Sequence, residues 1–321
     1  MQQPVLSIRN LKTYFSGRDA DVRAVDGVDI DIDAGQIVCI VGESGSGKSM
    51  TSLSVMGLVP RPKGKIVDGQ VWFDGLDLLT LSERQISDIR GQDISMIFQE
   101  PMTSLNPVLT IGDQLVEVLR RHRKTPKKEA LEKATEMLQF VGVARASEII
   151  RSYPHQLSGG MRQRVMIAMA MICEPKLLIA DEPTTALDVT IQAQVLELMR
   201  RMRDEFGTSI MMITHDLGVV AEMADRVVVM YAGQVVENGS GDQVFSTPLH
   251  PYTRALLASV PSVDEEKKTL YSIPGTVPNA ARFPEGCRFA DRCEYAQASC
   301  REAMPDLREL QEGHFVRCGL I

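Results

Sequence analysis

The sequence predicts an α/β protein built around a phosphate-binding loop, and three observations support this fold class. The apolar run within Gln36–Val41 suits a strand buried on both faces of a sheet, and it leads directly into a glycine-rich segment. Ser49–Leu58 then has helical character, which completes a strand–loop–helix order. Further along, short apolar runs alternate with helical patterns, and this alternation favours a largely parallel sheet.

The remaining elements follow from the same periodicities. Near the N-terminus, Val5–Ile8, Val28–Ile32 and Val71–Phe73 read as strands of one sheet. The middle third becomes helical, and we expect a helical subdomain inserted at about residues 101–170. The expected helices and later strands are Gly112–Arg123, Pro126–Val141, the stretch after Ser158, and then Leu177–Ala180, Ile210–Thr214, Val227–Met230 and Gln234–Glu237.

The pattern changes again near Pro248, where prolines, charges and cysteines replace the periodic apolar residues. The charged run Glu265–Lys268 has the character of a solvated connector. We therefore place a domain boundary near Ser246–His250. It separates a nucleotide-binding domain, residues 1–247, from a C-terminal extension, residues 248–321.

Composition excludes some classes of function. The chain has 321 residues and a formal net charge of -7, which argues against nucleic acid as the main partner. The start, Met1–Pro4, has no basic patch followed by an apolar stretch, and no window reaches the ~18 apolar residues of a membrane helix. We expect a protein that stays inside the cell and meets a membrane only through partners.

The glycine-rich segment matches the pattern G-x4-G-K-S in the context it needs, after a strand and before a helix. Glycines let backbone amides turn toward phosphate oxygens, and the helix N-terminus adds a favourable dipole. The lysine neutralises the β- and γ-phosphates of ATP, and the serine hydroxyl binds Mg²⁺. The predicted cofactor-binding residues are Gly42, Glu43, Ser44, Gly45, Ser46, Gly47, Lys48 and Ser49.

A second motif, Leu177–Glu182, is an apolar strand that ends in two carboxylates. The carboxyl ends of strands are where α/β proteins keep their sites. Asp181 can hold the magnesium shell, and Glu182 can polarise an attacking water as general base. A strand ending in Asp-Glu can also be merely solvated, but the phosphate loop upstream favours catalysis.

A third motif is Leu157–Arg164, in which Ser158, Gly159 and Gly160 stand at a predicted helix start. This arrangement is either a structural N-cap or a second amide-rich phosphate cradle. One chain has no use for two cradles on one nucleotide. Two chains arranged head-to-tail do, because each would close the other's site.

Together, these three motifs and their order over residues 5–240 resemble the ATP-binding cassette (ABC) ATPases. The resemblance implies an ABC cassette fold and assigns further roles by position. Gln99 would sense Mg²⁺, Asp188 would lie at the dimer seam, and His215 would touch the γ-phosphate. An aromatic residue, Phe15 or its neighbour Tyr14, would stack on adenine. The implied magnesium ligands are Ser49, Gln99 and Asp181.

Three shorter segments narrow the family further. Ser104–Pro107, Tyr153–Gln156 and His250–Thr253, followed by a group of cysteines, resemble the dipeptide/oligopeptide importer ATP-binding subunits, especially the dipeptide type. Relatives import nickel or glutathione. The resemblance implies a second cassette, expected to be a different chain, together with two permease subunits and an extracytoplasmic binding protein at the inner membrane. His250 and Tyr252 could equally be packing residues, which is our preferred interpretation.

The cysteines form two groups. We expect Cys39 and Cys173 to be buried thiols, whereas four others follow the spacing C-x5-C-x6-C-x17-C. An arginine stands beside each of these four and would offset the negative charge of thiolates around a metal. The spacing leaves zinc, an iron–sulfur cluster or four unrelated thiols open, and the resemblance favours a 4Fe–4S cluster with a structural role. The predicted ligands are Cys287, Cys293, Cys300 and Cys318, with His314 as the one nearby substitute.

Two other classes of function remain as alternatives. A soluble ABC ATPase acting on ribosomes or DNA usually carries two cassettes or a long coiled coil, and this chain has neither. An iron–sulfur redox protein would leave the hydrolytic residues unexplained. Sequence distance suggests no link between the cysteines and those hydrolytic residues, so we expect an import ATPase with a structurally independent metal site.

Overall fold

The computed structural model describes residues 3–99, 105–185, 187–260 and 271–321, which fall into two compact units. We call them the helical unit and the sheet unit. The helical unit comprises Met1–Val5, Asp33–Gln36 and Thr80–Met212. The sheet unit comprises Leu6–Ile32, Ile37–Leu79 and Ile213–Ile321, so the C-terminal extension belongs to the same unit as the phosphate loop.

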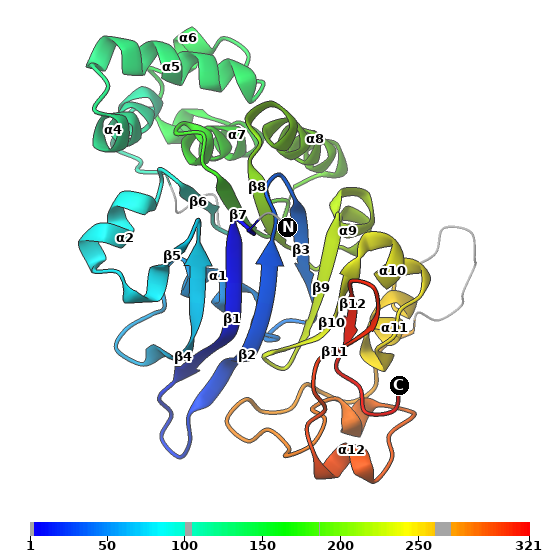
Figure 1. The fold of residues 1–321 in the computed structure, drawn as a ribbon. Coiled ribbons are helices and arrows are strands. Elements are labelled where there is room, and N and C mark those ends of the chain that lie inside the picture. The colour runs from blue at the N-terminus through cyan, green and yellow to red at the C-terminus, as the bar shows by residue number, and fades with distance from the viewer. Residues whose placement is uncertain (1–2, 100–104, 186, 261–270) are drawn as a thin grey trace. The chain divides into compact units, whose positions relative to one another are not determined.

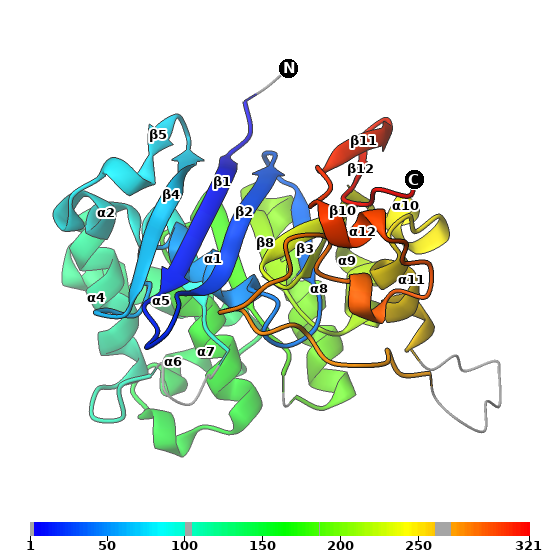
Figure 2. The same ribbon diagram turned by 90° about the horizontal axis from the view of Figure 1, so that it is seen from below.

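The sheet unit contains an antiparallel sheet in the order β2-β1-β4-β5 (Figure 2). Strand β1 pairs with both β2 and β4, which confirms that the three N-terminal strands share a sheet. Leu6, Ile8 and Leu11 of β1 are fully buried and form part of the core. The strand bounds are Leu6–Phe15 for β1, Val22–Ile32 for β2, Gly64–Phe73 for β4 and Leu76–Asp77 for β5.

A second set of strands in this unit has the order β11-β12-β10-β9-β3. All five residues of β3 are buried, as its apolar run predicts. Strand β3 pairs with β9 in parallel, whereas the β9–β10, β10–β12 and β11–β12 pairs are antiparallel. The turn between β9 and β10 is too short for the crossover connection that parallel strands need. The bounds are Ile37–Val41 for β3, Arg226–Tyr231 for β9, Gln234–Ser240 for β10, Arg308–Gln311 for β11 and His314–Val316 for β12.

Among its described residues, the sheet unit also contains five short α-helices. Helix α1 begins at Lys48, within the phosphate-loop motif, and α11 begins at a proline whose missing N–H costs nothing at that position. Strands β11 and β12 and helix α12 lie in the extension and were not predicted. The helix bounds are Lys48–Val55 for α1, Leu217–Met223 for α9, Gly241–Ser246 for α10, Pro251–Ala258 for α11 and Ser299–Glu302 for α12.

The helical unit places strands β8, β7 and β6 side by side in that order, with β6 and β7 parallel (Figure 1). Helices α4 and α5 begin and end within a residue of the predicted ranges, and α7 begins directly after Ser158, as predicted. The strand bounds are Ile94–Ile97 for β6, Leu177–Asp181 for β7 and Ser209–Ile213 for β8. The helix bounds are Glu83–Ile89 for α2, Ile111–Arg123 for α4, Lys127–Phe140 for α5, Ala146–Ile149 for α6, Gly159–Met171 for α7 and Val189–Phe206 for α8.

Among the helices that the structure describes, none combines the length and apolar character that crossing a membrane requires. The longest of them, α8, buries only one face, which includes Val195, Leu196 and Met199. This pattern is that of an amphipathic helix packed against a protein core.

Candidate functional site: an ATP-binding cassette with a cysteine-lined cavity

The phosphate loop has a backbone that only glycine can adopt at two key positions. Gly42 has φ 147° and Gly47 has φ 101°, in the region that L side chains avoid. A Cβ at Gly42 would collide with the Met230 carbonyl oxygen, and one at Gly47 with the Ala24 carbonyl oxygen. The chain's own packing therefore requires these glycines, and the loop keeps its amides close to the start of α1.

Lys48 and Ser46 are the loop's buried polar side chains. The Lys48 Nζ donates to the carbonyl oxygens of Gly42 (2.7 Å) and Glu43 (3.0 Å), so its ammonium lies over the loop. Ser46 Oγ is buried, and the residues that the structure describes offer it no hydrogen-bond partner. An unsatisfied hydroxyl beside a buried ammonium fits a site that receives phosphate oxygens.

The two candidate adenine residues lie at the end of β1 and differ in their partners. The Tyr14 hydroxyl donates to Asp26 Oδ1 at 2.5 Å, and burial together with this carboxylate raises the pKa of Tyr14 to about 12. Phe15 has no polar group to anchor and is half-buried. Adenine stacking by Phe15 stays a prediction. The bond to Asp26 holds Tyr14 in place, whereas Phe15 has no such partner among the residues that the structure describes.

The predicted general base, Glu182, contacts Gln99 within the helical unit. Asp181 ends β7 and is 5% exposed, and Glu182 follows it in the left-handed region with φ 49°. The Gln99 side-chain amide donates to Glu182 Oε2 at 2.9 Å, and the Thr185 hydroxyl donates to the same oxygen at 2.9 Å. The Glu182 carboxylate is thereby held in one orientation, as a water-activating base needs.

Ser158 is the N-cap of α7, and its hydroxyl accepts a hydrogen bond from the Met161 amide at 3.4 Å. Ser158 therefore acts as a structural N-cap. This role does not explain why glycine follows it, because a Cβ at Gly159 would meet nothing within 4 Å, and both Ser158 and Gly159 are exposed. Further along α7, buried Gln163 donates to the Pro183 carbonyl oxygen at 2.6 Å, which fastens this helix to the segment after Glu182.

Asp188 and His215 both lie at helix starts. Asp188 caps α8, its carboxylate accepting from the Ile191 amide at 2.9 Å. His215 is exposed and follows β8, just before the N-cap Asp216 of α9. Some residues next to Gln99 and Asp188, and the first residue of the Ser104–Pro107 segment, lie outside the described residues. They are Glu100, Pro101, Ala186 and Ser104.

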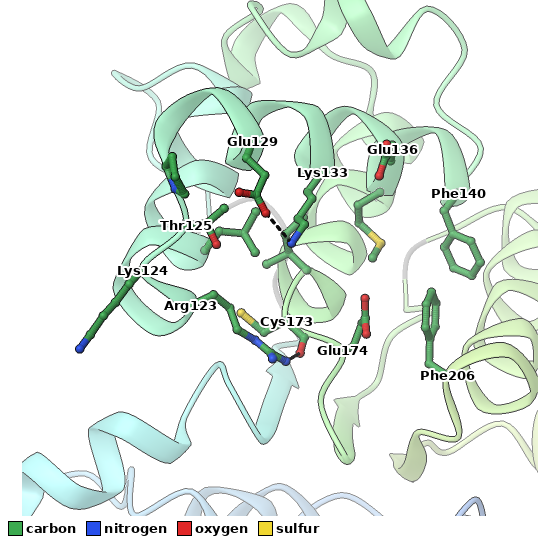
Figure 3. A pocket seen from close by; sticks show the side chains of 14 residues that line it. Arg123, Lys124, Thr125, Glu129, Lys133, Glu136, Phe140, Cys173, Glu174 and Phe206 are labelled. Atoms are coloured by element: carbon green, nitrogen blue, oxygen red, sulfur yellow. Dashed lines mark hydrogen bonds and ion pairs between the residues drawn. The ribbon is translucent and has the colours of Figure 1, made fainter.

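A separate pocket of about 660 Å³ lies in the helical unit and contains none of the predicted site residues (Figure 3). Its charges are mixed: Lys133 pairs with Glu129 at 3.1 Å, and Arg123 donates to the Cys173 carbonyl oxygen at 2.7 Å. Cys173 is 1% exposed and Cys39 is fully buried, which confirms both as buried thiols. Balanced charges and aliphatic walls select no particular ligand.

The four C-terminal cysteines line one cavity of about 220 Å³ in the sheet unit, together with mostly apolar side chains. None of the six cysteines forms a disulfide. Burial raises the pKa of the Cys287 and Cys293 thiols. Within the described ranges, no three His, Cys, Asp or Glu side chains are arranged to hold a metal ion. The four lining cysteines are Cys287, Cys293, Cys300 and Cys318.

None of the neighbouring arginines lines the cavity, but Arg317 lies close enough to Cys287 for their charges to interact. That the arginines offset thiolate charge stays a prediction. Arg288 forms an ion pair with Asp26, Arg301 pairs with Asp291 at 3.3 Å, and Arg317 donates to the Val235 carbonyl oxygen at 2.9 Å. Long side chains beside a cavity can turn outward to carboxylates and carbonyls, and spacing does not reveal which way they turn.

Arg292 corrects the expectation that no contact links the cysteine segment to the ATP-hydrolysing residues. Its guanidinium forms a bidentate ion pair with Glu43 of the phosphate loop, at 2.7 and 3.0 Å. Tyr252 also reaches this loop, because its hydroxyl accepts from the Glu43 amide at 2.8 Å. These partners are 249 and 209 residues apart in the sequence, so no local pattern could reveal them.

The extension is further anchored by a buried carboxylate that sequence inspection missed. Glu237 of β10 is fully buried and accepts hydrogen bonds from the Leu249 and His250 amides at 2.7 and 2.8 Å. His314 Nε2 lies 2.8 Å from the same carboxylate, so His314 is not among the residues lining the cysteine cavity. His250 and Tyr252 are buried, as expected of packing residues, but at the start of helix α11 rather than in an extended loop. Tyr252 also bonds to the phosphate loop, and His250 lines the cysteine cavity.

Comparison with known proteins agrees with this geometry. Residues 25–185 match the family model described as ABC transporter, and residues 236–300 match the model described as oligopeptide/dipeptide transporter, C-terminal region. The chain belongs to the ABC transporter family, as an ATPase cassette. Among its relatives is the oligopeptide transport ATP-binding protein AppD of Bacillus subtilis, 58% identical over 98% of this chain and 96% of that protein. The dipeptide transport ATP-binding protein DppD of the same organism is 51% identical over 99% and 95%.

Solved structures of cassettes are similar as well. The ATP-binding cassette MJ0796, as a dimer in a post-hydrolysis state bound to ADP and Pi, gives a TM-score of 0.66 at 27% identity, over 73% of this chain and 98% of that one. CbiO1 from Clostridium perfringens, part of the ABC transporter complex cbiONQ, gives 0.65 at 28% identity, over 77% and 92%. The ABC cassette fold and an ATPase activity coupled to transport are thus established for this chain.

Proposed function

We propose that this chain is the ATP-hydrolysing subunit of an importer of dipeptides or oligopeptides, working with separate permease subunits at the cytoplasmic face of the inner membrane. The observation that carries the catalytic part is the Glu182 carboxylate held by Gln99 and Thr185. The substrate class is supported by the relatives' names and by the matched C-terminal region.

In this proposal, each site residue has a defined task. Lys48 neutralises the β- and γ-phosphates, while Ser49, Gln99 and Asp181 hold Mg²⁺. Glu182 accepts a proton from the attacking water, and His215 contacts the γ-phosphate. Phe15 stacks on adenine. Catalysis then consists of positioning and of electrostatic stabilisation of the phosphoryl group as it is transferred to water.

The second cassette completes the site. Ser158, Gly159 and Gly160 would close over the nucleotide of a partner cassette, and Asp188 would lie at the seam of the head-to-tail dimer. The exposed Ser158 and the open space beside Gly159 support this role. We infer a heterodimer, served by an extracytoplasmic peptide-binding protein.

Uptake measurements test the substrate class. Disrupting the gene should abolish uptake of labelled dipeptides or oligopeptides and leave uptake of nickel and of glutathione unchanged. Wild-type protein should restore uptake, and the Glu182→Gln variant, made at the same level, should not. Normal peptide uptake with lost nickel or glutathione uptake would instead assign the solute to those relatives' class.

We further infer that Cys287, Cys293, Cys300 and Cys318 hold a 4Fe–4S cluster rather than zinc. One zinc ion at about 2.3 Å from each sulfur would bring the four sulfurs within about 4 Å of one another, whereas a cubane needs the larger space that a 220 Å³ cavity offers. Thiolate ligands and an apolar shell suit such a cluster. When bound, it would cross-link the segment around Cys287–Cys300 to the chain end that follows β12, a structural role.

Anaerobic purification followed by iron, sulfide and zinc analysis tests this inference. We expect four iron and four sulfide per chain, lost in Cys318→Ser and retained in His314→Ala and in the control Cys173→Ser. Stoichiometric zinc without iron would overturn the cluster. Four freely titrating thiols in folded, metal-free protein would overturn the site.

A further inference from the structure

The acidic second residue of the phosphate loop is an electrostatic problem for an ATP site. Glu43 directly follows Gly42, and its backbone carbonyl oxygen accepts from the Lys48 ammonium at 3.0 Å, so this acidic residue is part of the loop assigned to the triphosphate. Like charges repel each other more strongly at a protein surface than in bulk water, because the effective dielectric constant there is lower. An unpaired Glu43 would therefore oppose nucleotide binding.

Arg292 cancels this charge from the C-terminal extension. Both of its terminal nitrogens donate to the two Glu43 oxygens, at 2.7 and 3.0 Å, the geometry of a strong bidentate pair. The Arg292 side chain is 6% exposed and that of Glu43 is 25% exposed. The carboxylate raises the pKa of Arg292, so this guanidinium stays charged.

The rest of the Glu43 residue is held as well. Its amide donates to the Tyr252 hydroxyl at 2.8 Å, and its carbonyl oxygen accepts from Lys48 at 3.0 Å. Tyr252 is fully buried in an aromatic cluster, with its ring centroid 4.6 Å from Tyr231 and 5.4 Å from Phe289. Arg292 also donates to the Tyr231 hydroxyl at 3.2 Å, so the arginine and the cluster form one assembly.

Position along the chain connects this assembly to the cysteine cavity. Arg292 directly precedes Cys293, and Phe289 lies between Cys287 and Cys293 while lining the cavity itself. A backbone shift at these cysteines would move Arg292 and Phe289 together. The first turn of the phosphate loop is therefore supported by the same segment that carries three of the four cysteines.

We propose that Arg292 is a positioning residue for ATP binding, which neutralises Glu43 and, with Tyr252, braces the phosphate loop from the C-terminal extension. This inference rests on the assignment of Gly42–Ser49 as the ATP-binding loop and does not depend on which group fills the cysteine cavity. The extension thereby sets the affinity of the cassette for nucleotide.

The test compares ATP dissociation constants and steady-state ATPase kinetics of the full chain and three variants. Arg292→Gln should weaken ATP binding about tenfold or more and raise KM by more than it lowers kcat. The double variant Arg292→Gln/Glu43→Gln should return to within about threefold of wild type, because no carboxylate is then left unpaired. The control Arg301→Gln, beside Cys300 on an exposed pair, should leave binding unchanged.

Salt dependence separates charge cancellation from a general loss of folding. The ratio of the Arg292→Gln to wild-type dissociation constants should shrink as ionic strength rises, since salt screens the repulsion between Glu43 and phosphate. Arg292→Lys, which keeps the charge without the bidentate geometry, should lie between the two and serves if Arg292→Gln does not fold. An unchanged affinity in Arg292→Gln or Arg292→Lys, or a double variant as weak as the single one, would overturn the proposal. Absence of ATP binding by wild type would instead refute the assignment of the loop.

Discussion

Two glycine-rich segments in this chain lie at the starts of helices, yet they differ in what their glycines are for. In Gly42–Ser49, positive φ angles and collisions with Met230 and Ala24 carbonyls make glycine obligatory for the fold itself. At Ser158–Gly160, an added Cβ on Gly159 would meet nothing, and the loop is exposed.

This difference is expected if the two segments bind the phosphates of different nucleotides. The first loop is shaped by its own chain and, in our proposal, holds its own nucleotide. The second has glycines that its own chain does not need, which is expected if the space above them belongs to a partner's nucleotide. A glycine that neither a positive φ angle nor a neighbouring atom requires, such as Gly159, is thus informative about the assembly.

The largest effect is expected for Glu182→Gln, which leaves both loops intact and removes only the proposed base. Turnover should fall by about 10²–10⁴-fold, the usual contribution of a general base. ATP binding should persist, and a closed dimer should accumulate in which both kinds of loop engage nucleotide. Phosphate release and size-exclusion chromatography with ATP measure this. Turnover like that of wild type would refute the assignment of Glu182.

A pair of alanine variants tests the comparison between the loops directly. Gly42→Ala should lower the free energy of unfolding by about 1–3 kcal/mol, because of strained backbone and a clash with Met230. Gly159→Ala should change it by less than about 0.5 kcal/mol, as for an exposed site. Denaturant unfolding measures both. Equal losses would show that the two loops are not built differently.

The smallest effect is expected at the Ser158 cap. Ser158→Ala should cost about 0.5–1 kcal/mol of stability, since it removes the 3.4 Å bond from the Met161 amide. Ser158→Asp should keep that cap and stability but reduce turnover, because its charge would face phosphate. Thermal unfolding and ATPase assays on both variants separate the two roles. Full activity in Ser158→Asp would argue for a purely structural cap.

Local patterns predicted much of this molecule. Helix α4 and strand β3 were evident from periodicity and apolar runs. The motifs and the family resemblance named Gln99 and Glu182, but the contact between them was not predicted. The contacts of the C-terminal extension were not predictable. Glu43 and Arg292 are separated by 249 residues, and the orientation of an arginine depends on carboxylates that only the fold brings near.

In our proposal, Ser158–Gly160 serve the nucleotide of a partner cassette. Vanadate trapping with photoreactive ATP in the assembled transporter tests it most directly, because the label reports which cassette's phosphate loop holds nucleotide. Ser158→Arg in this chain should abolish labelling of the partner cassette and leave this chain labelled. Loss of label from this chain, with the partner still labelled, would contradict head-to-tail pairing.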